Sequence, residues 1–184
     1  MSSLSNKRII LGVTGGIAAY KSAEIIRRLQ DQGAEVRVVM TAAAEEFIRP
    51  LTMQALSGNP VHSQLLDSEA EAGMGHIELA RWADLLLIAP ASADFIANMV
   101  HGRADSLLAA IYLATPAKVA IAPAMNQAMW SHSASVENIN NLTRRGVTII
   151  GPETGSQACG DIGPGRMEQP DSIIEQASSL FNSG

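Results

Sequence analysis

The chain alternates between short segments that are almost wholly apolar and longer segments whose apolar residues recur at helical spacing. A short apolar run is typical of a buried strand, whereas apolar residues three or four positions apart form one face of a helix. The pattern predicts strands at 8–13, 35–40, 85–90, 118–124 and 147–150. It predicts helices at 17–32, 42–48, 51–58, 76–83, 92–114, 131–145 and 171–181, with 92–114 either one helix or two helices separated near Gly102. Residues 59–75 and 151–169 show no clear period and are predicted as loops.

Apolar strands that alternate with helices indicate a parallel sheet that is covered by helices on both faces. We therefore expect one domain over residues 1–184 with an α/β, Rossmann-like (flavodoxin-like) three-layer fold. Gly33 and Gly146 stand where helices before the second and fifth strands should end. Ligands of such sheets bind at the carboxyl ends of the strands, so the residues after each strand are the first candidates for a site.

Composition excludes several classes of function. The chain is 47% hydrophobic and 17% charged, as in a globular protein, and its net charge of −5 disfavours nucleic acid as the main partner. No apolar run reaches the roughly 18 residues that suggest a membrane span, and the N-terminal residues lack the apolar core of a signal peptide. Cys159 is the single cysteine, so an internal disulfide is excluded and a reducing, cytoplasmic location is expected.

A glycine turn, GVTGGIAA, joins the first strand to the first helix. Backbone N–H groups and the helix dipole at such a turn favour a phosphate, although a merely structural turn has the same appearance. The spacing is not the dinucleotide fingerprint G-x-G-x-x-G, and the second strand ends in MTAAA, without the acidic residue that would hold a ribose. A mononucleotide therefore fits better than NAD. Thr41 and Ser92 could add hydroxyl donors, although helix capping is the commoner role for each.

Four further side chains are candidates for chemistry. His76 could hold a carboxylate, move a proton or be purely structural, and Arg81 could face an anion or solvent. Asn126, in PAMNQAMW, could cap a helix or bind a ligand through its amide. Cys159 lies in GSQACGDIGPGRM, where four glycines and a proline suit a loop that closes over a site, although a free cysteine is often an unreactive buried residue. No Cys/His cluster has metal-ligand spacing, so no metal is predicted.

Five motifs occur together, in the order GVTGGIAAYK, MGHIELARWAD, APASADFIA, PAMNQAMW and SQACGDIGPGRM. This set resembles the homo-oligomeric flavin-containing cysteine decarboxylases, and within them the bacterial phosphopantothenoylcysteine decarboxylases of coenzyme A biosynthesis. The resemblance covers residues 8 to about 181. PAMNQAMW and ACGDIGPGRM are its specific parts, whereas the glycine turn is shared with other flavoproteins. It implies FMN as cofactor and 4′-phospho-N-pantothenoyl-L-cysteine as the substrate, which would give 4′-phosphopantetheine and CO₂.

The resemblance also implies roles for individual residues. Cys159 matches the proton donor of a mobile clamp, His76 the active-site histidine, and Asn126 the substrate-binding asparagine. The implied FMN-binding residues are Gly15, Gly16, Ile17, Thr41, Ala42, Ala43, Ser92, Ala93, Asp94, Phe95 and Ala124. The implied substrate-binding residues are Asn126, Arg81, Met129, Ala158, Cys159, Gly160, Asp161 and Arg166. Related members outside bacteria carry Asn-Thr in place of Asp94 and Phe95, so the resemblance assigns no role to those two side chains.

The implied reaction has a physical logic. A cysteine carboxylate loses CO₂ with difficulty, because the carbanion left behind has no electron sink. The resemblance implies that FMN first oxidises the thiol carbon to a thioaldehyde and that loss of CO₂ then gives an enethiol. A returned hydride and a proton from Cys159 would complete the product. Closure of the clamp over the substrate would exclude water from these intermediates.

The resemblance further implies homo-oligomers built from trimers, up to dodecamers, and fusion in bacteria to a phosphopantothenate–cysteine ligase domain. The chain is expected to be either a stand-alone form or an excised domain. Three alternatives are a decarboxylase of peptide C-terminal cysteine, a flavin prenyltransferase, and a non-catalytic FMN-binding regulatory subunit. The clamp sequence favours the phosphopantothenoyl substrate over a peptide. A prenyltransferase would need neither PAMN nor Cys159, and a regulatory subunit would be expected to lack His76 or Cys159.

Overall fold

A computed structural model describes residues 4–65 and 75–182. Within these residues five parallel strands form one sheet in the order β2-β1-β3-β4-β5. The strands are β1 (Arg8–Val13), β2 (Glu35–Met40), β3 (Leu85–Ala91), β4 (Lys118–Pro123) and β5 (Thr148–Ile149). The chain changes direction across the sheet between β1 and β3, and this is the point at which doubly wound folds bind ligands. The expected flavodoxin-like fold is confirmed.

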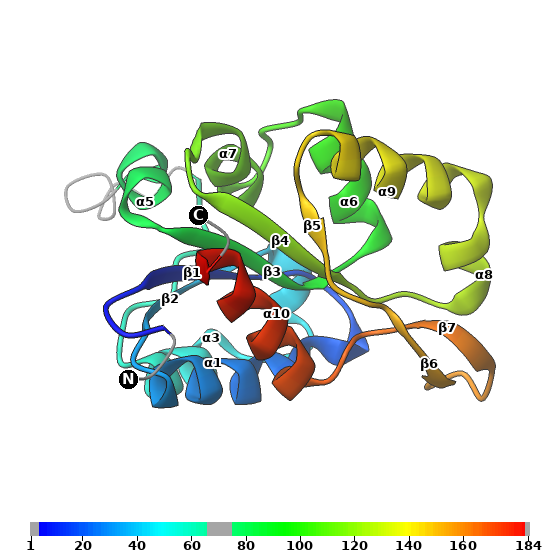
Figure 1. Cartoon of the computed structure of the whole chain (residues 1–184), viewed down its shortest axis with the longest axis horizontal. Coiled ribbons are helices and arrows are strands. Elements are labelled where there is room, and N and C mark those ends of the chain that lie inside the picture. Colours follow the sequence, from blue (N-terminus) through cyan, green and yellow to red (C-terminus); the bar gives the residue numbers. More distant parts are fainter. Residues whose placement is uncertain (1–3, 66–74, 183–184) are drawn as a thin grey trace.

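Helices cover both faces of the sheet (Figure 1). One layer contains α1 (Lys21–Asp31), which continues a 3₁₀ turn η1 (Ile17–Tyr20), together with α3 (Pro50–Ser57) and α10 (Pro170–Asn182). The other layer contains α5 (His76–Trp82), α6 (Ala93–His101), α7 (Leu107–Ala114) and α9 (Ser133–Arg144). Two short helices, α2 (Ala42–Glu45) and α8 (Gln127–Ser131), follow β2 and β4. Among the described residues no helix is long and apolar enough to cross a membrane.

The central strands are buried on both faces, which explains their continuous apolar sequences. In β3, Leu85 and Leu87 pack toward α1 and α10, whereas Leu86 and Ile88 pack toward α6 and α7. All four side chains are fully buried. Because successive side chains of a strand point to opposite faces, one apolar run serves both cores.

Glycines end three helices at the predicted positions, and Gly146 follows α9 with φ of 85°. Gly33 follows α1 with φ of 85°, and the N–H of Ala34 turns back to the Leu29 carbonyl at 3.1 Å. Gly102 follows α6 with φ of 65°, so the predicted region 92–114 is two helices. A left-handed residue at this point is accessible to glycine at little cost, which is why it stops a helix.

One prediction in the C-terminal half is wrong, and one helix was not predicted. Residues 151–169 are not all loop, because β6 (Glu153–Ser156) and β7 (Ile162–Arg166) form an antiparallel hairpin. The predicted helix 131–145 is confirmed as α9, which begins at Ser133, but the short helix α8 before it was not predicted. The hairpin strands ETGS and IGPGR lack the alternation that marks a half-buried strand, and α8 is too short to show a period. Residues 66–74 of the other predicted loop lie outside the described residues.

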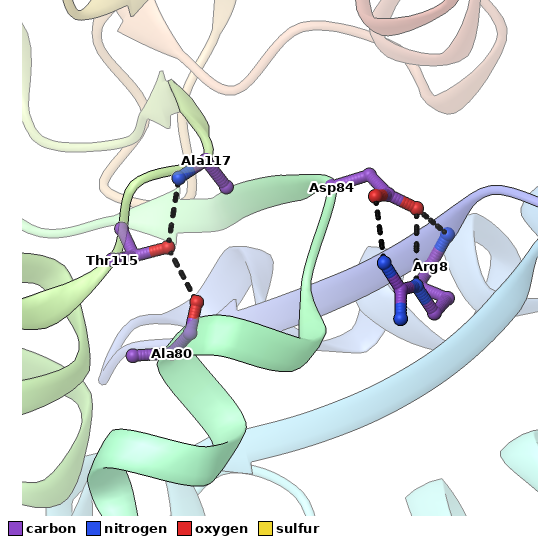
Figure 2. A network of polar contacts seen from close by, with 5 residues as sticks. All are labelled: Arg8, Ala80, Asp84, Thr115 and Ala117. Carbon is purple, nitrogen blue, oxygen red and sulfur yellow. Dashed lines mark hydrogen bonds and ion pairs between the residues drawn. The ribbon is translucent and has the colours of Figure 1, made fainter.

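Two polar clusters hold the C-terminal end of α5 in place (Figure 2). The Asp84 carboxylate accepts hydrogen bonds from the Arg8 backbone N–H at 2.9 Å and from its guanidinium at 3.3 and 3.1 Å. The Thr115 hydroxyl donates to the Ala80 carbonyl at 2.9 Å and accepts from the Ala117 N–H at 3.1 Å. The side-chain hydrogen bond from Arg8 holds the pKa of Asp84 below its usual range. These contacts join α5 to the start of β1 and the end of α7.

Candidate active site

A cavity of about 1060 Å³ lies at the carboxyl ends of the parallel strands and extends to the β6–β7 hairpin. This is the edge where the sequence predicts a ligand. Every residue predicted to bind FMN lines the cavity: Gly15, Gly16, Ile17, Thr41, Ala42, Ala43, Ser92, Ala93, Asp94, Phe95 and Ala124. The predicted substrate residues that line it are Asn126, Met129, Ala158, Cys159 and Arg166.

The glycine turn after β1 brings two loops into close contact. A Cβ at Gly15 would lie 2.5 Å from the Ala43 Cβ, so the turn packs against the start of α2 only because residue 15 has no side chain. Thr14 is buried, and its hydroxyl donates to the Pro90 carbonyl at 2.7 Å while accepting from the Ser92 N–H at 2.9 Å. Thr14 thereby links the ends of β1 and β3. Sequence reasoning missed it, although a lone polar residue at the end of an apolar strand was the available signal.

Thr41 and Ser92 both cap helices that start at the cavity. The Thr41 hydroxyl accepts from the Ala44 N–H at 3.2 Å, and the Ser92 hydroxyl accepts from the Phe95 N–H at 3.2 Å. Beyond Ser92, the N–H groups of Ala93 and Asp94 belong to the first turn of α6, where no intrahelical carbonyl is available. The start of α6 therefore offers donors and a positive dipole end to an anion.

The residues that line the cavity suit a flavin mononucleotide in their chemistry. A Cβ at Gly16 would meet no atom within 4 Å, so this side of the turn faces open space. Ile17, Phe95 and Met129 supply apolar wall, and the start of α6 supplies phosphate donors. An apolar cleft with a few convergent polar groups is the usual form of a cofactor site.

The orientation of the Asn126 carboxamide is determined by its role as the N-cap of α8. Its Oδ1 accepts from the Ala128 N–H at 2.8 Å. The Nδ2 group therefore faces the hairpin, where it lies 3.1 Å from Asp161 Oδ2 and 3.4 Å from Cys159 Sγ. Asn126 thus presents a donor, rather than an acceptor, to the space beside Cys159.

Cys159 lies in the turn between β6 and β7 and is exposed. Its thiol donates to Asp161 Oδ2, with 3.4 Å between Sγ and the oxygen. Asp161 does not line the cavity, but it contacts both Cys159 and Asn126 and so belongs to the same cluster. Gly160 has φ of 91° and does not line the cavity either, so its place is in the turn that presents Cys159.

Two cations face the cavity from the side of α1 and β7. The Lys21 side chain is buried and its Nζ donates to the Met167 carbonyl at 3.0 Å. Burial, and after it the charge of Arg166, lowers the pKa of Lys21. Arg166 pairs with Glu153 at 2.9 Å through its Nε. Sequence reasoning proposed Arg166 and missed Lys21, for which the YK at the end of the glycine motif was the only signal.

His76 and Arg81 are not among the residues that line this cavity. Both belong to α5, which lies at the opposite end of the molecule from β6 and β7 (Figure 1). The cause is topological, because α5 leads into the start of β3 whereas the cavity lies at the carboxyl ends of the strands. One copy of the chain therefore brings Asn126 and Cys159 together but leaves His76 and Arg81 apart from them.

The described residues also contain no group of three or more His, Cys, Asp or Glu placed to hold a metal ion.

The family model described as Flavoprotein matches residues 1–182. The chain belongs to this flavoprotein family. Over 181 residues this flavoprotein is 58% identical to the coenzyme A biosynthesis bifunctional protein CoaBC of Vibrio vulnificus, covering 98% of this chain and 45% of that protein. It is 57% identical to CoaBC of Escherichia coli over 180 residues, covering 98% and 44%. The chain thus spans less than half the length of these curated relatives.

Solved structures of flavin enzymes have the same fold as this flavoprotein. A cysteine-to-serine mutant of PPC decarboxylase, complexed with pantothenoylaminoethenethiol, gives a TM-score of 0.87 at 30% identity, covering 97% of this chain and 100% of that one. The FMN-dependent cysteine decarboxylase SpaF gives 0.83 at 32% identity, covering 97% and 99%.

Proposed function

We propose that this flavoprotein binds FMN and decarboxylates 4′-phosphopantothenoylcysteine to 4′-phosphopantetheine and CO₂. The observation that carries the proposal is the approach of Asn126 Nδ2 to Cys159 Sγ, 3.4 Å apart, at a cavity that the glycine turn also lines. The similarity to PPC decarboxylase and to CoaBC supports the same substrate.

The residues of the glycine turn and of the α2 and α6 starts would hold the cofactor. The start of α6 would receive the phosphate, and Ile17 and Phe95 would contact the ring system. Bound FMN supplies an electron sink that takes two electrons from the thiol carbon of the substrate and later returns them, so that the net reaction is redox-neutral.

Asn126 would bind the substrate carboxylate or its adjoining amide. Its Nδ2 now donates to the Asp161 carboxylate, and a substrate carboxylate could take the place of that partner. Met129 is 49% exposed and would contact the aliphatic part of the substrate together with Ala158. Arg166 would reach the substrate phosphate or another anion.

Cys159 would deliver the last proton. In this step the S–H bond breaks, a C–H bond forms on the former enethiol, and the thiolate that remains regains a proton from solvent, to which Cys159 is exposed. Asp161 and Gly160 would hold the thiol at the required place in the turn.

His76 and Arg81 would act from a neighbouring copy of the chain. We propose a homo-oligomer built from trimers, in which α5 of one copy faces the cavity of the next. Ile17 and Tyr20, beside the cavity, are 65% and 62% exposed, and exposed apolar side chains of this size suit an interface. Within it, His76 would orient or deprotonate the substrate.

The CoaBC relatives, of which this chain matches less than half, are named bifunctional. This supports a role for the chain as one part of a bifunctional protein. We propose that the other part is a phosphopantothenate–cysteine ligase and that the protein is cytoplasmic. The chain itself would then account for the decarboxylation step alone.

The proposal is tested by anaerobic incubation of the flavin-loaded protein with 4′-phosphopantothenoylcysteine, with CO₂ release and product mass as readouts. A peptide that ends in cysteine is the comparison substrate. We expect CO₂ and 4′-phosphopantetheine from the first compound and little turnover of the second. Turnover of the peptide alone would assign a peptidyl-cysteine decarboxylase instead, and turnover of neither would leave prenyl transfer or regulation as the role.

A further inference from the structure

Gln157 opens the turn between β6 and β7, next to Cys159. Its side chain is half-buried, whereas Ala158, Cys159 and Gly160 after it are exposed. A backbone hydrogen bond from the Gln157 N–H to the Asp161 carbonyl, at 2.8 Å, closes the turn. The side chain of Gln157 extends toward the Met125–Gln127 loop, and its Oε1 also accepts a hydrogen bond from the Cys159 thiol, with 3.9 Å between the oxygen and Sγ.

The Gln157 carboxamide joins the hairpin to the Met125–Gln127 loop through all of its polar atoms. Its Oε1 accepts from the Gln127 N–H at 3.0 Å and from Asn126 Nδ2 at 3.4 Å. Its Nε2 donates to the Met125 carbonyl at 3.4 Å and to the Pro164 carbonyl at 3.3 Å. One side chain thus contacts the residue before Asn126, Asn126 itself and the residue after it.

The hairpin approaches the loop closely at two glycines of β7. The Met125 N–H donates to the Gly165 carbonyl at 2.9 Å, and a Cβ on Gly165 would lie 2.3 Å from the Met125 carbonyl oxygen. A Cβ on Gly163 would lie 1.9 Å from Gln127 Oε1. The glycines allow β7 to approach the loop, and Gln157 supplies the side-chain hydrogen bonds across this contact.

We propose that Gln157 is a positioning residue that docks the β6–β7 hairpin on the Met125–Gln127 loop and thereby holds Cys159 beside Asn126. Docking brings the thiol to the substrate that Asn126 binds. The effect on product formation rests on the proposed function, because it assumes that Cys159 protonates the enethiol. The docking itself does not depend on that reaction.

Two substitutions at Gln157 distinguish the loss of its two donors from the loss of all its hydrogen bonds. Gln157→Glu keeps the size and the acceptor oxygen but removes both donors and sets a carboxylate oxygen against the carbonyls of Met125 and Pro164. Gln157→Met keeps the length and removes all of these hydrogen bonds without adding charge. Gln176→Glu is the matched control, because it makes the same chemical change on α10, where the Gln176 Nε2 donates to the Ser172 hydroxyl at 3.1 Å.

Hydrogen exchange on the flavin-loaded protein reports docking without any substrate. We expect amides of residues 153–166 and of the Met125–Gln127 loop to exchange at least about fivefold faster in Gln157→Glu and Gln157→Met, as loss of two or more hydrogen bonds requires. The control Gln176→Glu should exchange like the parent in these segments. Unchanged exchange in both Gln157 variants would overturn the docking role.

Product analysis after one anaerobic turnover reports the position of the thiol. If Cys159 is displaced, CO₂ is still lost but a larger share of the product is the enethiol, two hydrogen atoms lighter than the saturated thiol. A general loss of folded enzyme would lower both products in proportion and leave this share unchanged. Faster exchange with an unchanged enethiol share would overturn the positioning role. A parent protein that releases no CO₂ would instead count against the proposed function, while the exchange data would still test docking.

Discussion

The two ends of the Asn126 carboxamide have different partners. Its oxygen caps α8 through the Ala128 N–H, at 2.8 Å, and its nitrogen faces Asp161 and Cys159. Capping and ligand binding were alternatives for this residue in the sequence, yet the two roles are compatible because each uses a different end of the amide. The cap also excludes the flipped orientation, in which the carboxamide nitrogen would face the Ala128 N–H.

Gly15 and Gly16 are neighbours with opposite tolerance for a side chain. A Cβ at Gly15 would lie 2.5 Å from Ala43 Cβ, whereas a Cβ at Gly16 would meet no atom within 4 Å. Gly16 has an extended backbone with φ of 170°, which any residue adopts. We expect Gly15→Ala to lower the free energy of unfolding by about 1–3 kcal/mol through overpacking, and Gly16→Ala to change it by less than about 0.5 kcal/mol.

Urea unfolding of the two variants without flavin measures this difference, and flavin absorbance per protein reports the site. Gly16→Ala should keep its stability and still lose flavin, because the added methyl group enters the space that the cofactor would fill. Equal stability of the two variants would contradict the close approach of the loops, and full flavin content in Gly16→Ala would contradict the placement of the cofactor.

At the scale of elements, the sequence predicts the strands and helices that pack on a core. It misses those that are held by local contacts. The strands β1 to β4 and the helices α1 and α10 carry apolar patterns long enough to recognise, because each packs on a core. The β6–β7 hairpin carries no such pattern, because its strands are short, contain few apolar side chains and pair through backbone hydrogen bonds. Helix α8 buries none of its residues and is set by its Asn126 cap.

Removing the ion pair between Arg8 and Asp84 tests whether this contact, which joins the end of α5 to the sheet, stabilises the fold. The pKa of Asp84 is lowered in the folded protein, so its charge stabilises the fold above the pKa of the unfolded chain, about 3.9, and this contribution is lost as the pH falls through the lower folded pKa. Asp84→Asn should therefore lower the thermal midpoint by a few degrees at most at pH 7, because the pair is partly exposed.

The same difference should persist at pH 5 and shrink below about pH 4, where the parent carboxylate also becomes protonated. Thermal scans of parent and variant across this range make the comparison. A difference that increases on acidification, or none at pH 7, would show that the Arg8–Asp84 contact does not stabilise the fold.

For the whole molecule, the sequence predicts the parallel three-layer fold and the edge at which the cavity lies. The residues expected to bind FMN all line that cavity, because each follows the carboxyl end of a strand and parallel strands end at the same edge. His76 and Arg81 could not be placed in this way, because they lie on α5 before β3, and their relation to the cavity depends on how copies of the chain assemble. Of the three residues expected to be catalytic, one chain brings only Asn126 and Cys159 together at the cavity.

The most direct test of the account is the product that Cys159→Ser forms from 4′-phosphopantothenoylcysteine in one anaerobic turnover. A hydroxyl is slightly smaller than the thiol and is a much weaker acid, so it should not deliver the final proton. The account predicts that the variant releases CO₂ and accumulates the enethiol, two hydrogen atoms lighter than the product of the parent. Formation of saturated 4′-phosphopantetheine at the rate of the parent would contradict the role of Cys159 as the proton donor.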